Sequence, residues 1–158
     1  KRLSVVRDDC VLIVAGSGEY EAELAHLISG MSNVIRVPWV DRTQLVQLLS
    51  VSDVFLYPSI AYGGWEEQFG YSMAEASLME LPVISTRTGS IDEVVRHGET
   101  GMLVTPSHAD ELFQAMLNLA NDGTLRTRMG KAGRTYIAQH FSHEMVAQRF
   151  YHFFKTLL

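Results

Sequence analysis

The feature that most constrains the fold of this chain is the alternation of short, mostly apolar runs with segments of helical periodicity. The apolar runs lie at residues 11–15, 34–37, 53–57, 83–85 and 102–104. Runs of this length without a strict polar alternation are typical of strands that are buried on both faces. The segments between them repeat apolar residues at helical spacing. Strands that alternate with helices predict an α/β fold, a Rossmann-like doubly wound parallel sheet with helices on both faces.

Bulk properties narrow the class of protein further. The length of 158 residues fits one domain, and a composition of 47% apolar and 20% charged residues is ordinary for a globular protein. A net charge of −5 without a stripe of Lys and Arg argues against nucleic acid as a partner. Cys10 is the single cysteine, which leaves no internal disulfide and favours a reducing compartment. No apolar run approaches the roughly 18 residues that a membrane span needs.

One segment carries most of the functional information. The apolar run 54–57 is broken by Pro58-Ser59, and a helix-forming run begins near residue 71, which predicts a strand, a loop and a helix. Glu67 lies in the loop, and Glu75 lies just over one turn into the helix. The N–H groups at a helix start suit a phosphate, and flanking carboxylates suit sugar hydroxyls. We therefore expect a nucleotide-sugar cleft near residues 65–75, at the C-terminal ends of the strands.

Other motifs give weaker signals. Gly16-Ser17-Gly18 follows an apolar run, but Glu21 stands where the dinucleotide fingerprint has its third glycine, so a tight turn is favoured over a dinucleotide site. The six histidines show no convincing metal-ligand spacing, and no G-x-S-x-G elbow is present, so neither a metal site nor a hydrolase triad is expected. The last helix has an aromatic stripe, which we interpret as core or interdomain packing: Phe150, Tyr151, Phe153 and Phe154.

The spacing of Glu67 and Glu75 resembles the signature of the retaining GT-B glycosyltransferases of family 4, also called glycosyl transferases group 1. The resemblance continues through residues 88–95, 98–104 and 129–134, and it covers nearly all of the chain from Val11 onward. It implies that this is the C-terminal donor-binding domain of a hexosyltransferase. Such enzymes move a hexose, with retention, from a nucleotide-diphosphate sugar to a saccharide or lipid acceptor, and they use no further cofactor and usually no bound metal.

The resemblance also implies a role for each part of the motif. Glu67 is the catalytic candidate and binds hydroxyls of the donor sugar, which the N–H groups of Phe69 and Gly70 also meet. The N–H groups of Tyr71 and Ser72 meet the diphosphate. Glu75 holds the ribose hydroxyls. The loop that contains Trp39 and Val40 runs beside the nucleotide base and binds it.

Some positions depart from the family pattern. The strand–helix unit with a G-R…K-G segment, whose cations neutralise the diphosphate, has no counterpart before Val11. Ser90 replaces the second glycine of the family's Gly-Gly-x-x-Glu loop, and Asp92 replaces its usual proline. We expect residues 1–158 to form a donor-binding domain that lacks this first unit and the N-terminal acceptor domain, and that does not transfer sugar alone. The expected location is the cytoplasm, and the inner face of the membrane is one site there that the resemblance allows.

Three alternatives stay open at this point. A nucleotide-sugar epimerase of the same fold shares the donor geometry but needs other acid and base groups. A non-catalytic nucleotide-binding module predicts no effect of Glu75 on binding. A dinucleotide oxidoreductase is disfavoured by Glu21. The donor base, the sugar, the acceptor and the oligomeric state are equally open.

Overall fold

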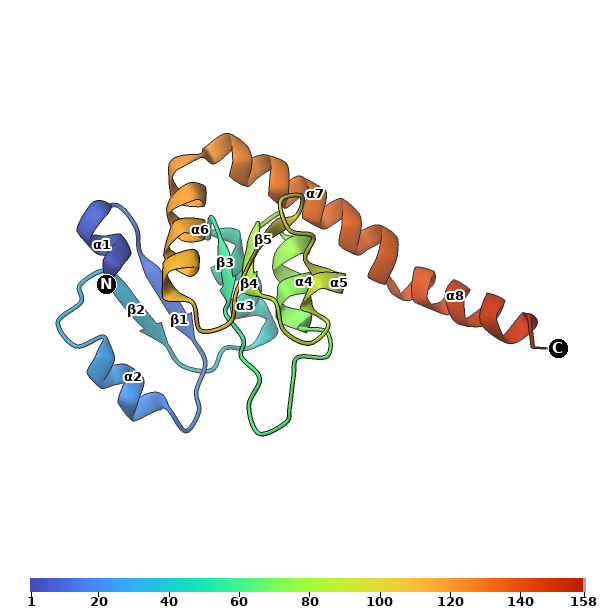
Figure 1. The fold of residues 1–158 in the computed structure, drawn as a ribbon, viewed down its shortest axis with the longest axis horizontal. Coiled ribbons are helices and arrows are strands. Elements are labelled where there is room, and N and C mark those ends of the chain that lie inside the picture. Colours follow the sequence, from blue (N-terminus) through green and yellow to red (C-terminus); the bar gives the residue numbers. More distant parts are fainter. Residues whose placement is uncertain (158) are drawn as a thin grey trace. The chain divides into compact units, whose positions relative to one another are not determined.

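A computed structural model describes residues 1–157 of the chain and divides them into two compact units (Figure 1). The first unit is Lys1–Val51, and the second begins at Ser52.

The first unit contains a two-stranded parallel sheet and three helices. Its elements are α1 (Arg2–Val6), β1 (Leu12–Ala15), α2 (Glu21–Leu27), β2 (Val34–Val37) and α3 (Arg42–Ser50). Strands β1 and β2 pair in register, with Leu12 opposite Val34. The first helix, α1, was not predicted from the sequence.

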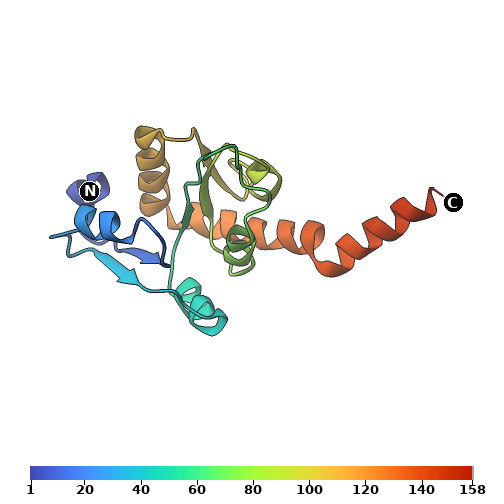
Figure 2. The same ribbon diagram turned by 90° about the horizontal axis from the view of Figure 1, so that it is seen from below.

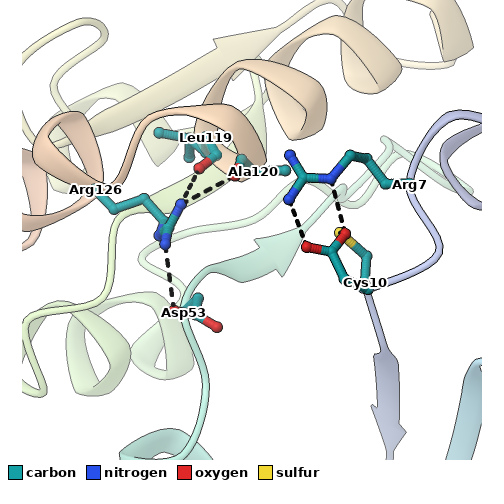
Figure 3. Close-up of polar contacts among 7 residues, drawn as sticks. Arg7, Cys10, Asp53, Leu119, Ala120 and Arg126 are labelled. Atoms are coloured by element: carbon teal, nitrogen blue, oxygen red, sulfur yellow. Dashed lines mark hydrogen bonds and ion pairs between the residues drawn. The ribbon is translucent and has the colours of Figure 1, made fainter.

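Polar contacts define the ends of several elements in the first unit. Helix α3 begins with a capping box, in which the Asp41 side chain accepts from the Gln44 N–H at 2.9 Å and the Asp41 N–H donates to the Gln44 side chain at 3.0 Å. After α1, Arg7 makes a two-pronged ion pair with Asp9, at 2.8 and 2.6 Å (Figure 3). The capping box satisfies backbone N–H groups at the start of α3, whereas the Arg7–Asp9 pair joins two side chains.

The second unit contains a three-stranded parallel sheet and the remaining helices. Its elements are β3 (Phe55–Tyr57), α4 (Tyr71–Leu78), β4 (Val83–Thr86), α5 (Ile91–Val94), β5 (Gly101–Val104), α6 (Ala109–Asn121), α7 (Gly123–Phe141) and α8 (His143–Lys155). The strand order is β3-β4-β5, so β4 is central. Helix α6 lies to one side of this sheet and α4 and α5 lie to the other, as Figures 1 and 2 show. This arrangement confirms the predicted α/β class with parallel strands.

The core of the second unit is built around β4. All four residues of β4 are buried, as expected of a parallel strand that is covered on both faces. An apolar cluster joins β4 and β5 to α6 and α7: Ile84, Val104, Ala115, Leu119 and Met129. Burial of apolar surface of this kind stabilises the unit.

Arg126 fixes the corner between α6 and α7. Its guanidinium donates to the carbonyls of Leu119 and Ala120, at 2.6 and 3.2 Å, and lies 3.7 Å from the Asp53 carboxylate (Figure 3). A cation at the last carbonyls of a helix satisfies acceptors that have no intrahelical donor. The side chain of Asp122 caps the start of α7 by accepting from the Leu125 N–H at 2.8 Å.

The aromatic stripe of α8 is exposed in this structure. Its side chains are between 58% and 64% exposed: Phe150, Tyr151, Phe153 and Phe154. The stripe is therefore not part of the core of the second unit, so its interpretation as core packing was wrong. The other interpretation, packing against another domain, stays a prediction. A helix face of 3.6-residue periodicity predicts that the face will be covered, but the periodicity does not say by what.

Five strands were predicted, and residues 1–157 contain five, but these strands pair in two sheets rather than in one. The order is β1-β2 in one sheet and β3-β4-β5 in the other. An apolar run predicts a strand because it reflects local burial, whereas the choice of hydrogen-bonding partner depends on contacts distant in sequence. The pattern alone could not supply the pairing.

Gly130 gives a stability prediction for the contact between α7 and α4. A Cβ at Gly130 would overlap the backbone carbonyl of Glu80, whereas a Cβ at Gly133 would make an ordinary contact with Ser77 at 3.5 Å. Gly130→Ala should lower the free energy of unfolding by about 1–3 kcal/mol, the usual cost of overpacking. Gly133→Ala, the matched control in the same helix, should be neutral or stabilising by up to about 1 kcal/mol because alanine favours helix.

Urea unfolding of both variants beside the wild type measures this difference. Equal free energies of unfolding for the two alanine variants would show that α7 does not approach the backbone at Glu80 this closely.

Candidate functional site

The site is built where β3 ends, and β4 holds that end in place. The Ser85 hydroxyl donates to the Tyr57 carbonyl at 2.6 Å, and the Thr86 hydroxyl donates to the Ser59 carbonyl. Both hydroxyl side chains belong to buried residues of the central strand. Because buried polar groups need partners, these bonds fix the path of the chain as it leaves the sheet.

Glu67 is a buried carboxylate with several hydrogen-bond donors. It is 8% exposed; its Oε2 accepts from the Tyr57 hydroxyl at 2.6 Å and its Oε1 accepts from the Gly70 N–H at 3.0 Å. The Phe69 N–H lies farther from Oε1, at 3.5 Å. The Tyr57 hydroxyl, with help from these N–H groups, holds the pKa of Glu67 below its ordinary value although burial opposes this. Burial and the hydrogen bond to Glu67 raise the pKa of Tyr57 to about 12.

Gly70 turns the chain from the Glu67 loop into α4. Its φ of 71° is left-handed, a conformation that glycine adopts without the penalty other residues meet. Its carbonyl accepts from the N–H groups of Met73 and Ala74. The N–H groups of Tyr71 and Ser72 therefore precede the first helical bonds of α4. Such N–H groups, with the positive end of the helix dipole, favour an anion.

The loop after β4 packs against the Glu67 backbone. Gly89 has a φ of 54°, and a Cβ at this position would overlap the Glu67 carbonyl oxygen. The next N–H, that of Ser90, donates to the same carbonyl at 3.0 Å. Two loops that follow neighbouring strands thus meet at Glu67, and the contact requires glycine at position 89.

A tight hairpin precedes Glu67. Tyr62 and Trp65 exchange both backbone hydrogen bonds, at 3.0 and 2.9 Å, across Gly63-Gly64, and both glycines have positive φ. This geometry is typical of a two-residue turn of the primed type. Tyr62 is 71% exposed and Trp65 is 54% exposed, so the hairpin presents two aromatic side chains beside the Glu67 loop.

The structure brings some of the predicted site residues together. Glu67, Phe69 and Gly70 share one hydrogen-bonded loop. Tyr71, Ser72 and Glu75 follow on α4, where Glu75 is half-buried. Trp39 and Val40 lie in the first unit, directly after β2 and its following proline, and Trp39 is exposed. The base-binding role of these two residues stays a prediction.

The loop N–H groups differ from their expected use. Phe69 and Gly70 were predicted to present N–H groups to the sugar, whereas here both point at the Glu67 carboxylate. Spacing places a residue in a loop, but it does not show which acceptor its N–H faces. A sugar contact by these two groups stays a prediction.

Two hollows in the described residues lie apart from residues 65–75. One, of about 340 Å³, lies between β5 and α6 and is lined by residues that include His97, Asp110 and Glu111. The other lies along the junction of α7 and α8, beside Phe141 and Phe150. Neither contains a predicted site residue, so the expected cleft near residues 65–75 is not one of these hollows. Within residues 1–157, no helix is long and apolar enough to cross a membrane.

Sequence reasoning missed Tyr57 as part of the site. The residue ends the apolar run 54–57, and it was assigned only to a strand. A tyrosine at the last position of a buried strand, before a proline, places a polar tip where the loop begins. That position is the signal that could have identified it.

The chain belongs to the glycosyl transferases group 1 family, whose family model matches residues 1–136. The match includes the Glu67 loop and α4. The family assignment made from the Glu67 and Glu75 spacing is therefore confirmed.

Curated relatives agree with this assignment. A GDP-mannose-dependent monoacylated alpha-(1-6)-phosphatidylinositol monomannoside mannosyltransferase of Corynebacterium glutamicum is 32% identical over 146 residues, which are 90% of this chain and 38% of the relative. The capsular polysaccharide biosynthesis glycosyltransferase CapM of Staphylococcus aureus is 30% identical over 152 residues, 93% of this chain and 38% of the relative. The chain thus spans about 38% of the length of these relatives.

Solved structures show the same fold. Sucrose-phosphate synthase of Thermosynechococcus elongatus matches with a TM-score of 0.77 and 26% identity, over 92% of this chain and 38% of that one. HepE of Anabaena, in complex with UDP, matches with a TM-score of 0.85 and 23% identity, over 98% of this chain and 43% of that one. These structures agree with the Rossmann-like fold predicted from the sequence.

The contact at Gly89 predicts a specific loss of stability. Gly89→Ala should lower the free energy of unfolding by the strain of a left-handed alanine, about 1–2 kcal/mol, plus about 1–3 kcal/mol for the clash with Glu67. Gly98→Ala is the matched control, because Gly98 also has a positive φ, of 80°, but has nothing within 4 Å of a Cβ. Chemical denaturation measures both, and equal losses would contradict the close approach at Glu67.

The lowered pKa of Glu67 predicts a dependence of stability on pH. Because the folded-state pKa lies below the unfolded value of about 4.3, the contribution of the carboxylate is present above about pH 4.3 and is lost as the pH falls through the folded-state pKa. Glu67→Gln should cost about 1–3 kcal/mol at pH 7, since two donors lose a charged acceptor.

Denaturant titrations from pH 7 to pH 3 should show the wild-type and Glu67→Gln stabilities converging at the acid end. Glu66→Gln, a change at the exposed neighbouring position, should stay within about 0.5 kcal/mol of the wild type. A difference between wild type and Glu67→Gln that is constant over this range would contradict the assigned ionisation.

Proposed function

We propose that this chain is the C-terminal donor-binding domain of a retaining glycosyltransferase. The enzyme would move a hexose from a nucleotide-diphosphate sugar to a saccharide or lipid acceptor. One observation carries the proposal: in a member of this family, the buried Glu67 carboxylate is fixed at the loop that leads directly into the N-terminus of α4. We propose that the carboxylate accepts from sugar hydroxyls and that the adjacent N–H groups of α4 donate to the diphosphate.

The proposed division of labour follows the order of the residues. Glu67 accepts hydrogen bonds from hydroxyls of the donor sugar. The N–H groups of Tyr71 and Ser72 meet the diphosphate, where the helix dipole and the unpaired N–H groups favour negative charge. Glu75, one turn further along α4, accepts from the ribose hydroxyls. This order matches the linear order of sugar, diphosphate and ribose in the donor.

The proposed reaction draws its stabilisation from the protein's own groups. As the glycosidic bond to the diphosphate breaks, negative charge grows on the leaving phosphate, and preorganised N–H groups of α4 stabilise it without reorganising. No bound metal or further cofactor is part of the proposal. The acceptor would be held by a second domain of the enzyme, and catalysis requires both domains because proximity of the two reactants supplies much of the rate. We place the enzyme in the cytoplasm, with peripheral membrane contact if the acceptor is a lipid.

The names of related proteins favour transfer over epimerisation. The mannosyltransferase and CapM are both named as transferases, and the mannosyltransferase is named as GDP-mannose-dependent. HepE is a structural neighbour whose solved complexes contain UDP, or UDP-glucose. Donors that contain uracil or guanine are therefore the first to test.

A donor panel tests the proposal. The chain is titrated calorimetrically with UDP-glucose, UDP-N-acetylglucosamine, GDP-mannose and ADP-glucose, beside UDP, GDP, ADP and NADH. We expect one base to be preferred, and its nucleotide sugar to bind more tightly than the bare nucleoside diphosphate. Binding of NADH with none of the sugar nucleotides would overturn the proposal.

Glu75 gives the matching mutational prediction. Glu75→Gln should weaken binding of the preferred nucleoside diphosphate by about 1–3 kcal/mol, the range for a hydrogen bond to a charged group. Glu80→Gln is the control, because Glu80 is an exposed acid just beyond the end of the same helix. Calorimetry measures both, and an unchanged affinity in a folded Glu75→Gln protein would remove Glu75 from the ribose site.

A further inference from the structure

We propose that Tyr57 is a positioning residue for the donor sugar, because its hydroxyl binds one oxygen of the buried Glu67 carboxylate and, with the Gly70 N–H on the other oxygen, holds the carboxylate in one orientation. The inference rests on the proposed function, since it assigns a sugar-binding role to Glu67. It adds a residue that lies outside the Glu67-to-Glu75 motif and that comes from the sheet rather than from the loop.

The two oxygens of Glu67 are held separately. The Tyr57 hydroxyl donates to Oε2 at 2.6 Å, within the range of a charge-assisted O–H···O⁻ bond. The Gly70 N–H donates to Oε1 at 3.0 Å. Each carboxylate oxygen can accept two hydrogen bonds, so the anchored carboxylate still has capacity for sugar hydroxyls. Fixing both oxygens sets the direction of that remaining capacity.

Tyr57 is itself fixed by the sheet. It is the last residue of β3, it lies opposite Ser85 in the register with β4, and its carbonyl accepts from the buried Ser85 hydroxyl at 2.6 Å. Its ring stacks near that of Phe55, with ring centroids 6.4 Å apart and an interplanar angle of 14°. A group on a strand is placed more precisely than one on a loop. The hydrogen bond from Tyr57 therefore restrains the position of the Glu67 carboxylate relative to the sheet.

The contact with Tyr57 favours the ionised form of Glu67. Burial of a carboxyl group favours its neutral form, and a neutral carboxyl would offer a donor where the sugar needs an acceptor. The groups that face Glu67 are the Tyr57 hydroxyl from β3 and the N–H groups of residues 68–70 from the loop, and the Ser72 hydroxyl interacts with the phenol from α4. Among them, the Tyr57 hydroxyl contributes most to lowering the pKa of Glu67.

Tyr57→Phe in the 158-residue chain tests the inference, because it removes the hydroxyl and keeps the ring. UDP and UDP-glucose, and GDP and GDP-mannose, are titrated calorimetrically. We expect affinity for the bare nucleotide to stay within twofold of the wild type. The gain that the sugar provides, which is the affinity for the nucleotide sugar divided by that for the bare nucleotide, should fall about five- to tenfold. In a Glu67→Gln background, Tyr57→Phe should change this gain by less than twofold, because Tyr57 acts through the carboxylate.

A second measurement needs no ligand. The side-chain carboxyl carbon of Glu67, assigned by its loss in Glu67→Gln, is followed by carbon-13 NMR as the pH is lowered. Tyr57→Phe should raise the pKa of Glu67. The matched control is Tyr136→Phe, which removes another hydroxyl that donates a hydrogen bond in the second unit, to the Glu93 carbonyl at 2.9 Å. This control should change neither the Glu67 pKa nor the contribution of the sugar.

The outcomes separate the two proposals. If wild type binds no sugar nucleotide, the proposed function fails, and the NMR titration still decides whether Tyr57 controls the ionisation of Glu67. If wild type binds the donor and Tyr57→Phe leaves the sugar's contribution and the Glu67 pKa unchanged, the inference is overturned. Equal weakening of bare nucleotide and nucleotide sugar would overturn it as well. If Tyr57→Phe does not fold, Glu67→Gln in an otherwise unchanged chain must lower the phenol pKa of Tyr57 from about 12, and an unchanged phenol would refute the coupling.

Discussion

The central strand β4 is the constraint on which both the core and the site of the second unit depend. Val83 and Ile84 are fully buried, and they anchor a sheet that is covered on both faces. The same strand ends in two buried hydroxyl residues, Ser85 and Thr86, whose hydroxyls bind carbonyls of the β3 exit. A strand with apolar residues at its start and hydroxyls at its end therefore builds the core and shapes the loop in one element. The path of that loop decides where Glu67 can lie.

Placing Glu67 in a buried position has an energetic cost that the surrounding groups offset. An isolated carboxylate loses solvation on burial, and it becomes neutral unless donors replace the lost water. Tyr57 from the sheet and Gly70 from the helix start supply such donors, so the charge is kept by elements on both sides of the loop. The consequence is a carboxylate that is oriented before any ligand binds. In the proposed function, a sugar hydroxyl would meet this oriented carboxylate, so little ordering would be needed on binding.

The sequence predicted the parts of this fold that depend on local pattern. The strand expected at residues 34–37 has the bounds of β2. Strand pairing and the exposure of the α8 aromatic residues were not predictable, because both depend on contacts between residues distant in sequence. The hydrogen-bond partner of Tyr57 was hidden for a related reason. The position of Tyr57 at a strand end marks its phenol as a candidate, but it does not identify Glu67, ten residues away across a loop, as the acceptor.

Two departures from the family pattern are explained by backbone geometry at the Gly89 loop. Ser90 replaces a glycine, but its φ is −98°, a conformation open to any residue, and it contributes its N–H rather than its side chain to the Glu67 carbonyl. Gly89 has a φ of 54° and no room for a Cβ, so it is the position of the pair that must remain glycine. Asp92 replaces a proline in the first turn of α5, where proline is tolerated because its missing N–H has no helical partner. An acid at the same place interacts favourably with the helix dipole. Both substitutions thus preserve the support beneath Glu67, because that support is made by backbone atoms and by one glycine.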